Sequence, residues 1–256
     1  ALVTGGARRL GRHMALYLAG RGHDVAVHYH GSHDAAEALV DEIHGMGRQA
    51  VALQADLTQE AEVQALLTAA TDGLGGALTL LVNNASIFEP DGVATATRES
   101  WDRHLESNLR APVVLTQHFA QQAPRAIRDH RGEPLSQALV VNMLDQRVRK
   151  LTPAFMSYTI AKMGLWAFTQ TSAQALAPNV RVNAIGPGPT LAAERQSEQH
   201  FARQRSATIL QRGANPEDIT TTLGYLIDSP GVTGQLLCVD GGQHLGWKTP
   251  DVLGPE

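Results

Sequence analysis

Cysteine is almost absent from this sequence, and long hydrophobic runs are missing. Cys238 is the single cysteine in 256 residues, so the chain cannot close a disulfide within itself, which is typical of proteins in a reducing compartment. The longest candidate for an apolar run, residues 138–144, is far shorter than the roughly 18 residues that a membrane span needs. We therefore expect a cytoplasmic protein without a membrane partner.

Neither sign of charge is in large excess, and no linker divides the chain. Lys and Arg number 21 and Asp and Glu 25, a formal net charge of −4. Because nucleic-acid binding depends on cations that neutralise phosphates, we expect no nucleic-acid partner. Repeats and Pro/Gly-rich linkers are missing, so we expect one domain over residues 1–256. The sequence opens at Ala1 without an initiator Met, so we expect the natural N-terminus upstream and read no targeting signal.

Short apolar or β-branched runs alternate with longer amphipathic stretches. The expected strands are residues 1–4, 25–29, 50–54, 79–83, 138–143, 180–184 and 235–239. The expected helical stretches include residues 12–19, 35–45, 60–70, 100–122 and 154–177. This alternation predicts βαβ units. We expect an α/β fold of the Rossmann type, with a doubly wound, parallel, seven-stranded sheet and helices on both faces.

Two segments interrupt this alternation. Residues 124–137 are charged and rich in turn formers, and we expect a surface excursion before the fifth strand. Residues 190–211 are polar and follow the run Gly186-Pro187-Gly188-Pro189. A long polar segment after such a hinge is typical of a mobile lid over a substrate site, although an ordinary pair of surface helices is the alternative.

The first expected strand runs into a glycine-containing loop, residues 4–11, that opens a helix. Glycine lets the backbone approach a pyrophosphate, and the helix N-terminus supplies free N–H groups. The second strand ends His28-Tyr29-His30-Gly31-Ser32, without the acid that would bond the ribose 2′-hydroxyl of NAD. Arg8 and Arg9, the latter where a second glycine would often stand, add positive charge for a 2′-phosphate. These residues favour NADP(H) over NAD(H).

Several polar residues near the expected strands have two interpretations. Asp34 is better placed to cap a helix than to bind a ribose. Asp56, just past the third strand, can accept from the adenine amino group, cap the next helix, or do both. His28, His30 and His33 have no evident fourth ligand, so we expect no metal site.

Tyr158 and Lys162 are spaced i, i+4 in a helical stretch and therefore share one face. A phenol has an unperturbed pKa near ~10, and a cation one turn away stabilises the phenolate and eases proton exchange with a substrate. Such a pair is common on helices. Here it follows a strand that ends Asn142-Met143-Leu144-Asp145, thirteen residues before Tyr158, and a dinucleotide-binding pattern.

With these motifs in this order, the sequence resembles the short-chain dehydrogenase/reductase family over essentially its whole length. The matching motifs are the 4–11 loop, Asn83-Asn84-Ala85, Asn108, Tyr158-x-x-x-Lys162, Gly186-Pro187-Gly188 and Val239-Asp240-Gly241-Gly242. The resemblance implies that Tyr158 donates a proton, that Lys162 lowers the pKa of Tyr158 and holds the nicotinamide ribose, and that Asn108 organises a proton-relay water. It also implies a homo-oligomer, usually a tetramer formed through the helices that carry Asn108 and Tyr158. We expect cofactor contacts from Gly5, Ala7, Arg8, Arg9, Leu10, His30, Ser32, Asp56, Leu57, Asn84, Ala85, Tyr158, Lys162, Pro187, Gly188 and Thr190.

Asp145 departs from the family, which usually has a serine there that bonds a substrate carbonyl. This acid, together with residues 8–11, 28–32 and 84–88, is similar to the pteridine reductase branch and its dihydromonapterin reductase-like relatives. The branch implies that Phe88 stacks a pterin against the nicotinamide and that Arg9 and Ser86 contact pterin and cofactor phosphates. Gly31 stands where the branch can carry an arginine that grips the 2′-phosphate. A structural acid at Asp145 and simple lid packing at Phe88 are the alternatives.

We therefore predict an NADPH-dependent oxidoreductase that reduces a C=N bond of a pterin, a dihydropterin or a dihydrofolate-like compound. The predicted catalytic residues are Asp145, Tyr158, Lys162 and Asn108, and the predicted substrate contacts are Arg9, Ser86, Phe88, Asp145 and Tyr158. One alternative is a carbonyl reductase of 3-oxoacyl thioesters, which needs a hydroxyl where Asp145 stands. The other is a non-catalytic dinucleotide-binding regulator, which need not keep Asn108, Tyr158 and Lys162 together.

Overall fold

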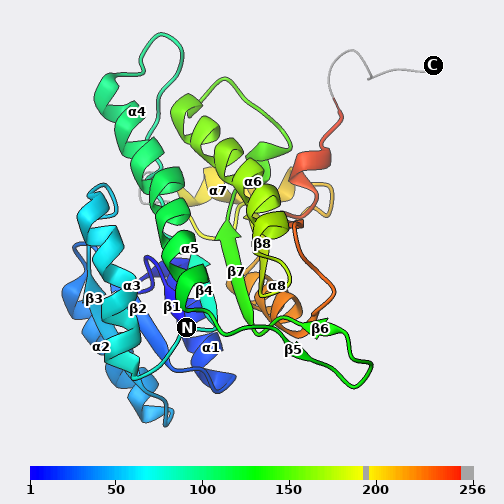
Figure 1. Cartoon of the computed structure of the whole chain (residues 1–256). Coiled ribbons are helices and arrows are strands. Elements are labelled where there is room, and N and C mark those ends of the chain that lie inside the picture. The colour runs from blue at the N-terminus through cyan, green and yellow to red at the C-terminus, as the bar shows by residue number, and fades with distance from the viewer. Residues whose placement is uncertain (193–195, 249–256) are drawn as a thin grey trace.

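The computed structural model describes residues 1–192 and 196–248, and a twisted parallel sheet runs through its centre (Figure 1). The strands lie in the order β3-β2-β1-β4-β7-β8-β9, and all neighbours pair in parallel. Their bounds are β1 Leu2–Val3, β2 Val25–Tyr29, β3 Ala50–Gln54, β4 Leu80–Asn83, β7 Ala138–Met143, β8 Val180–Pro187 and β9 Leu236–Val239. The chain reverses its direction of winding between β1 and β4, so the predicted doubly wound Rossmann-type sheet is confirmed.

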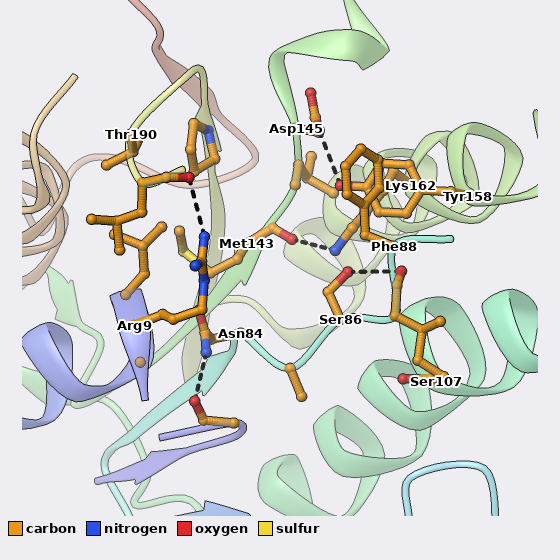
Figure 2. Close-up of a pocket in the computed structure, with 18 of the residues that line it drawn as sticks. Arg9, Asn84, Ser86, Phe88, Ser107, Met143, Asp145, Tyr158, Lys162 and Thr190 are labelled. Carbon is orange, nitrogen blue, oxygen red and sulfur yellow. Dashed lines mark hydrogen bonds between the residues drawn. The ribbon is translucent and has the colours of Figure 1, made fainter. Parts of the chain in front are cut away.

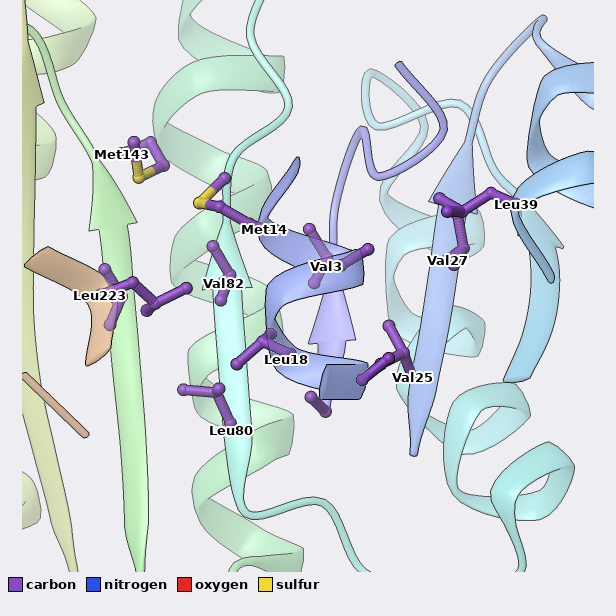
Figure 3. Close-up of a cluster of buried hydrophobic side chains, with 14 of the residues drawn as sticks. Val3, Met14, Leu18, Val25, Val27, Leu39, Leu80, Val82, Met143 and Leu223 are labelled. Carbon is purple, nitrogen blue, oxygen red and sulfur yellow. The ribbon is translucent and has the colours of Figure 1, made fainter. Parts of the chain in front are cut away.

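Neighbouring residues of each strand face opposite sides of the sheet because side chains alternate along a strand. On one side, Val3, Val27 and Val82 pack with Met14 and Leu223 (Figure 3). The helices on this side are α1 Arg9–Gly20, α2 His33–Gly45 and α8 Pro216–Asp228. The other side is covered by α3 Glu60–Leu74, α5 Ala111–Gln122 and α6 Met156–Leu176. Burial on both faces explains why the strands are continuous apolar runs.

The expected helix over residues 100–122 has an interruption that sequence periodicity did not reveal. Helix α4, Arg98–Leu105, follows the N-cap residue Thr97, whose side chain caps the helix together with Ser100. It continues through a π-helical turn, η1 Glu106–Arg110, into α5. Such wide turns are frequent at functional sites, and this one carries Asn108.

The two interrupting segments take different forms. Residues 124–137 contain a small exposed hairpin of β5 Ile127–Arg128 and β6 Pro134–Leu135, in agreement with the expected surface excursion. The described part of residues 190–211 contains one helix, α7 Glu198–Ser206, in place of the helix pair that was the alternative to a lid. No residue of α7 is buried, so few packing contacts hold it.

Two predicted helix caps were wrong. Helix α2 begins at His33 after the N-cap residue Ser32, so Asp34 lies inside the first turn, where its charge still favours the helix N-terminus. Helix α3 begins at Glu60, and Asp56 instead closes a local turn by accepting from the Thr58 N–H at 2.9 Å.

Among residues 1–192 and 196–248, we find no helix with the length and hydropathy to cross a bilayer.

Candidate functional site

A cleft of about 590 Å³ opens at the carboxyl edge of the sheet, next to the point where the winding reverses. Its walls come from the segments that directly follow the strands, namely residues 84–88 after β4, 143–147 at the end of β7 and 187–191 at the end of β8. Figure 2 shows Arg9 and Asn84 on one side of this cleft and Asp145, Phe88 and Tyr158 on the other. Open α/β sheets bind their ligands at this place in the fold.

The loop between β1 and α1 is packed so closely that glycine is required at two positions. Gly5 has a φ of +58°, and a Cβ there would lie 3.0 Å from the Cα of Ala85. A Cβ on Gly11 would lie only 2.0 Å from the carbonyl oxygen of Gly5. The loop is therefore pressed against the end of β4, and the first N–H groups of α1 are presented at the edge of the cleft.

The buried side chain of His28 holds this loop in place through hydrogen bonds. Its Nδ1 accepts from the Gly5 N–H at 2.9 Å, and its Nε2 donates to the carbonyl of Ala55 at 3.0 Å. Burial lowers the pKa of His28 to about 4, so the ring is neutral and both nitrogens are engaged.

Within the described residues, no group of three or more His, Cys, Asp or Glu side chains is placed to hold a metal ion.

Arg9 joins the glycine loop to the segment that precedes α7. Its guanidinium donates to the carbonyl of Leu191 at 3.1 Å (Figure 2) and to the carbonyl of Ala192 at 2.8 Å. Arg8 and His30 are exposed and line the same end of the cleft. A Cβ on Gly31 would meet no atom within 4 Å, so the surface beside the end of β2 is open. This end of the cleft is positively charged and accessible.

Tyr158 and Asp145 are hydrogen-bonded to each other at the opposite end. The Tyr158 hydroxyl donates to Oδ2 of Asp145 at 3.0 Å, and Oδ1 of Asp145 accepts from the Arg147 backbone N–H at 2.7 Å. Burial, and then the charge of Asp145, raise the pKa of Tyr158 well above its ordinary value. The phenol therefore holds its proton, whereas the family resemblance implied a lowered pKa.

Lys162 lies beneath Tyr158 on the same helix face. Its Nζ donates to the carbonyl of Met143 at 2.8 Å and lies 5.7 Å from the centre of the Tyr158 ring. Burial lowers the pKa of Lys162 from 10.5 to about 8, so the side chain still carries its charge at neutral pH and loses it only above about pH 8. The i, i+4 spacing thus brings the two side chains to one face, as the sequence predicted.

Asn108 does not face the cleft. Its Oδ1 accepts from the Ile87 N–H and its Nδ2 donates to the Ile87 carbonyl, both at 2.8 Å. Both ends of the side chain are therefore used to hold the loop after β4, and the relay role implied for Asn108 has no free side-chain group here. Its neighbour Ser107 lines the cleft instead.

Aromatic rings cover Tyr158 on the side of the cleft. Phe88 stacks on Phe155 with ring centres 4.3 Å apart and an angle of 16° between the planes. Phe88 also meets the Tyr158 ring edge-on at 4.6 Å, and 36% of its surface is exposed. Phe155 was missed from sequence, although it lies only three residues before Tyr158 at the start of the same helix.

A buried polar cluster joins the Phe88 loop to the helix that carries Tyr158. The Asp91 carboxylate accepts from the Ser157 N–H at 3.1 Å and from the Ser157 hydroxyl. His104 shares a 2.6 Å hydrogen bond with the same hydroxyl, and its Nε2 accepts from the Glu89 N–H at 3.2 Å. The N-cap residue of helix α6 makes no side-chain cap, and Asp91 caps the helix from another segment. Because Ser157 directly precedes Tyr158, this contact helps to hold the Tyr158 side chain in position.

Most of the residues predicted at the site are brought together. Those that line the cleft are Gly5, Arg8, Arg9, Leu10, His30, Asp56, Leu57, Asn84, Ala85, Ser86, Phe88, Asp145, Tyr158, Lys162, Pro187, Gly188 and Thr190. Ala7, Ser32 and Asn108 are not among the lining residues, because Ala7 is buried in the core, Ser32 precedes α2, and Asn108 is turned to Ile87. The lining residues that sequence reasoning missed include His28, Ser107, Arg147, Phe201 and Gln204.

The solved structures that resemble this chain include two bacterial reductases. The FolM alternative dihydrofolate reductase 1 from Brucella suis, in complex with NADP, is 45% identical with a TM-score of 0.90, and the match covers 98% of this chain and 97% of that one. The corresponding protein from Brucella canis, also complexed with NADP, is 44% identical with a TM-score of 0.90, over 98% and 96% of the two chains.

Sequence comparison extends the likeness to reductases of another substrate. A 3-oxoacyl-[acyl-carrier-protein] reductase, FabG, from Staphylococcus aureus is 30% identical over 250 residues, which cover 96% of this chain and 98% of the relative. A family model described as enoyl-(acyl carrier protein) reductase matches residues 5–244. Because the sheet order, the glycine loop and the Tyr158–Lys162 pair agree with these matches over nearly the whole length, the chain belongs to the short-chain dehydrogenase/reductase family of oxidoreductases.

Proposed function

We propose that this protein uses NADPH to reduce a C=N bond in a pterin, a dihydropterin or a dihydrofolate-like substrate. The observation that carries the proposal is the hydrogen bond of 3.0 Å from the Tyr158 hydroxyl to the carboxylate of Asp145, inside the cleft. The likeness to two FolM alternative dihydrofolate reductases supports the same substrate class.

The cofactor is NADP(H), and the residues present fit it. The loop at Gly5 and Gly11 is too closely packed for a Cβ at either position. It lies at the N-terminus of α1, where free N–H groups favour a pyrophosphate. Arg8 and His30 are exposed beside the end of β2, where no acid competes for a 2′-phosphate. When bound, the cofactor supplies the hydride.

The reaction chemistry separates the two candidate substrate classes. Reduction of a carbonyl builds negative charge on oxygen, which a nearby carboxylate such as Asp145 opposes. Reduction of a C=N bond builds a basic nitrogen that must gain a proton. Tyr158 holds a proton at its hydroxyl, and Asp145 can accept hydrogen bonds from ring N–H or amino groups and relay a proton through Tyr158. The pair therefore suits a nitrogen heterocycle.

Reduction of 3-oxoacyl thioesters is the second candidate, because the FabG relatives match nearly the whole chain. Asp145 counts against it, since it removes the hydroxyl that would stabilise the carbonyl oxygen. A non-catalytic regulator is not favoured, because Tyr158, Lys162 and Asp145 are all assembled in one cleft.

A side-by-side assay tests the proposal. NADPH oxidation is measured with dihydrobiopterin, dihydrofolate and an acetoacetyl thioester at equal concentrations. We expect turnover of the two dihydropterins and little or none of the thioester. Turnover of the thioester alone would return the protein to the carbonyl reductases.

Arg9→Ala is expected to weaken NADPH binding by about tenfold or more and NADH binding far less. Charge-assisted hydrogen bonds to phosphate contribute about 1.5–3 kcal/mol each, enough for this discrimination. Loss of the contacts from Arg9 to Leu191 and Ala192 affects both cofactors alike. The ratio of the dissociation constants for NADPH and NADH therefore reports only the contact of Arg9 with the 2′-phosphate. Arg12→Ala is the control, because Arg12 lies on the same helix but pairs with Glu42. Equal affinity of the parent for NADPH and NADH would contradict the assignment.

The segment around α7 is proposed to act as a lid that orders when ligands bind. Hydrogen exchange in residues 190–192 and 196–205 is expected to slow when NADPH and a pterin are added together. Helix α7 has no buried residue. Arg9 donates to the carbonyls of Leu191 and Ala192 before it, and Arg205 within it donates to the Pro189 carbonyl at 2.8 Å, so ligands can tighten contacts that already exist. The equally exposed β5–β6 hairpin serves as the control. Unchanged protection of α7 would indicate a static surface helix.

We also propose that the chain forms a homo-oligomer. Trp101, Ile160 and Met163 are large apolar side chains on α4 and α6 that remain 37–40% exposed, and a second copy of the chain could cover them. The cytoplasmic location also stays a prediction from the sequence.

A further inference from the structure

We propose that Arg147 forms a subsite for a carboxylate on the tail of the substrate. The inference rests on the proposed function and narrows it, because it names a pterin with an anionic tail as the preferred class. Arg147 lies in the short helix η2 Gln146–Val148, directly after Asp145, and lines the cleft.

The guanidinium of Arg147 packs against the aromatic cluster of Phe155, Phe88 and Tyr158. Its Cζ is 5.2 Å from the centre of the Phe155 ring, Phe155 stacks on Phe88, and Phe88 meets Tyr158. The positive charge of Arg147 is also close enough to act on the Tyr158 hydroxyl, whose pKa it lowers slightly against the larger effects of burial and Asp145. Because the guanidinium packs on Phe155 and not on Phe88 or Tyr158, we assign it to a substituent of the substrate and the Phe88–Tyr158 side to the reacting ring.

Part of this guanidinium has no partner. Nη1 donates to the Thr152 hydroxyl and, at 3.5 Å, to the Ala154 carbonyl. Nε is buried and without a hydrogen-bond partner. Among residues 1–192 and 196–248, no carboxylate lies within ion-pairing distance of Arg147, whereas Arg12, Arg103 and several other arginines are paired. A guanidinium presents its donors in a planar fork that matches a carboxylate, so the terminal nitrogens of the half-buried Arg147 suit an anionic ligand in the cleft.

Few charged side chains surround this cation in the cleft. The acids among its described lining residues are Asp56, beyond β3, and Asp145. Asp145 keeps its negative charge, but its oxygens are directed to the Tyr158 hydroxyl and the Arg147 backbone N–H and form no ion pair with the Arg147 guanidinium. Lys162 is turned to the Met143 carbonyl, and Arg9 to the carbonyls before α7. Arg147 is therefore the cation at the substrate end that is open to a ligand charge.

Arg149 provides a matched control. It lies two positions further along the chain, and its guanidinium stacks over Trp166 at 5.3 Å without lining the cleft. Replacement of either arginine by glutamine removes one positive charge from the same short stretch. Only the change at Arg147 alters the charge inside the cleft.

A comparison of two substrates that differ only in the substituent on the pterin ring measures the contribution of the charged tail. Dihydrofolate and dihydrobiopterin share the reducible dihydropterin ring, but dihydrofolate carries a glutamate with carboxylates and dihydrobiopterin an uncharged hydroxylated chain. We expect Arg147→Gln to lower the ratio of kcat/KM for dihydrofolate to that for dihydrobiopterin by about tenfold, mainly through KM. Arg147→Lys should keep part of the preference, and Arg149→Gln should leave the ratio unchanged. Added salt should raise KM for dihydrofolate in the parent more than in Arg147→Gln.

Binding measurements keep the subsite separate from the proposed reaction. Dissociation constants of both compounds are measured by calorimetry on the parent and variants saturated with NADP⁺. If the parent binds both and reduces neither, the proposed function fails, and a selective loss of dihydrofolate affinity in Arg147→Gln still supports the subsite. If Arg147→Gln weakens both compounds equally, or neither, the subsite is refuted, and Arg147 acts by bracing residues 152–155.

Discussion

Replacing Asp145 by alanine is expected to lower dihydropterin turnover by at least about a hundredfold, the usual scale of a lost acid–base group. The reason is that the Tyr158 hydroxyl donates to Asp145 at 3.0 Å and needs it to pass a proton to a nitrogen of the substrate. NADPH affinity should stay nearly the same, because Asp145 lies at the opposite end of the cleft from Arg9 (Figure 2). Stopped-flow turnover and fluorescence titration of NADPH measure the two quantities.

Asp145→Ser separates a catalytic acid from a structural one. The serine hydroxyl should restore whatever carbonyl reduction the cleft permits, without recovering dihydropterin reduction. Loss of the carboxylate also removes the acceptor for the Arg147 N–H, so thermal unfolding of both variants is measured as a control. An Asp145→Ala protein that reduces dihydropterin as fast as the parent would make Asp145 a purely structural acid.

Lys162→Met is expected to lower turnover by at least about a hundredfold and to change how stability depends on pH. Burial lowers the pKa of Lys162 from 10.5 in the unfolded chain to about 8 in the fold. Below pH 8 both states carry the proton, and the pH dependence from this group is flat. Between pH 8 and 10.5 only the unfolded state keeps it, so the free energy of unfolding rises with pH, by up to about 1.4 kcal/mol per unit.

Urea unfolding at pH 7.5, 8.5 and 9.5 measures this slope. The parent should gain stability over the series relative to Lys162→Met, whose methionine does not titrate. Turnover of the parent should fall above about pH 8, where the ammonium that faces Tyr158 loses its charge. Parallel stability profiles of parent and variant would show that Lys162 is not desolvated as its burial implies.

Local patterns in the sequence were sufficient to predict the strands and the reacting pair. The strands β2, β3 and β7 have the predicted bounds, because strands of a parallel sheet covered by helices are short apolar runs that end at turn-forming residues. Tyr158 and Lys162 share a helix face because their spacing is one helical turn. The position of Asp145 after β7 likewise followed from its distance to Tyr158 along the chain.

Contacts between distant segments could not be predicted in this way. Asn108 faces Ile87, 21 positions away, and Asp91 caps the helix of Ser157, 66 positions away. No periodicity of either segment carries this information, because the partners meet only after the sheet has formed. The π-helical turn that carries Asn108 is hidden for the same reason, since residues 100–122 keep a helical pattern throughout.

The sequence by itself therefore determined the α/β fold, the glycine loop and the set of reacting groups Asp145, Tyr158 and Lys162, because short-range spacing specifies each of them. Only the tertiary structure decided how those groups titrate. Burial raises the pKa of Tyr158 and lowers that of Lys162, and burial depends on every segment that closes over them. The same holds for Arg147, because only the folded chain brings its side chain to the cleft and leaves its buried Nε without a hydrogen-bond partner.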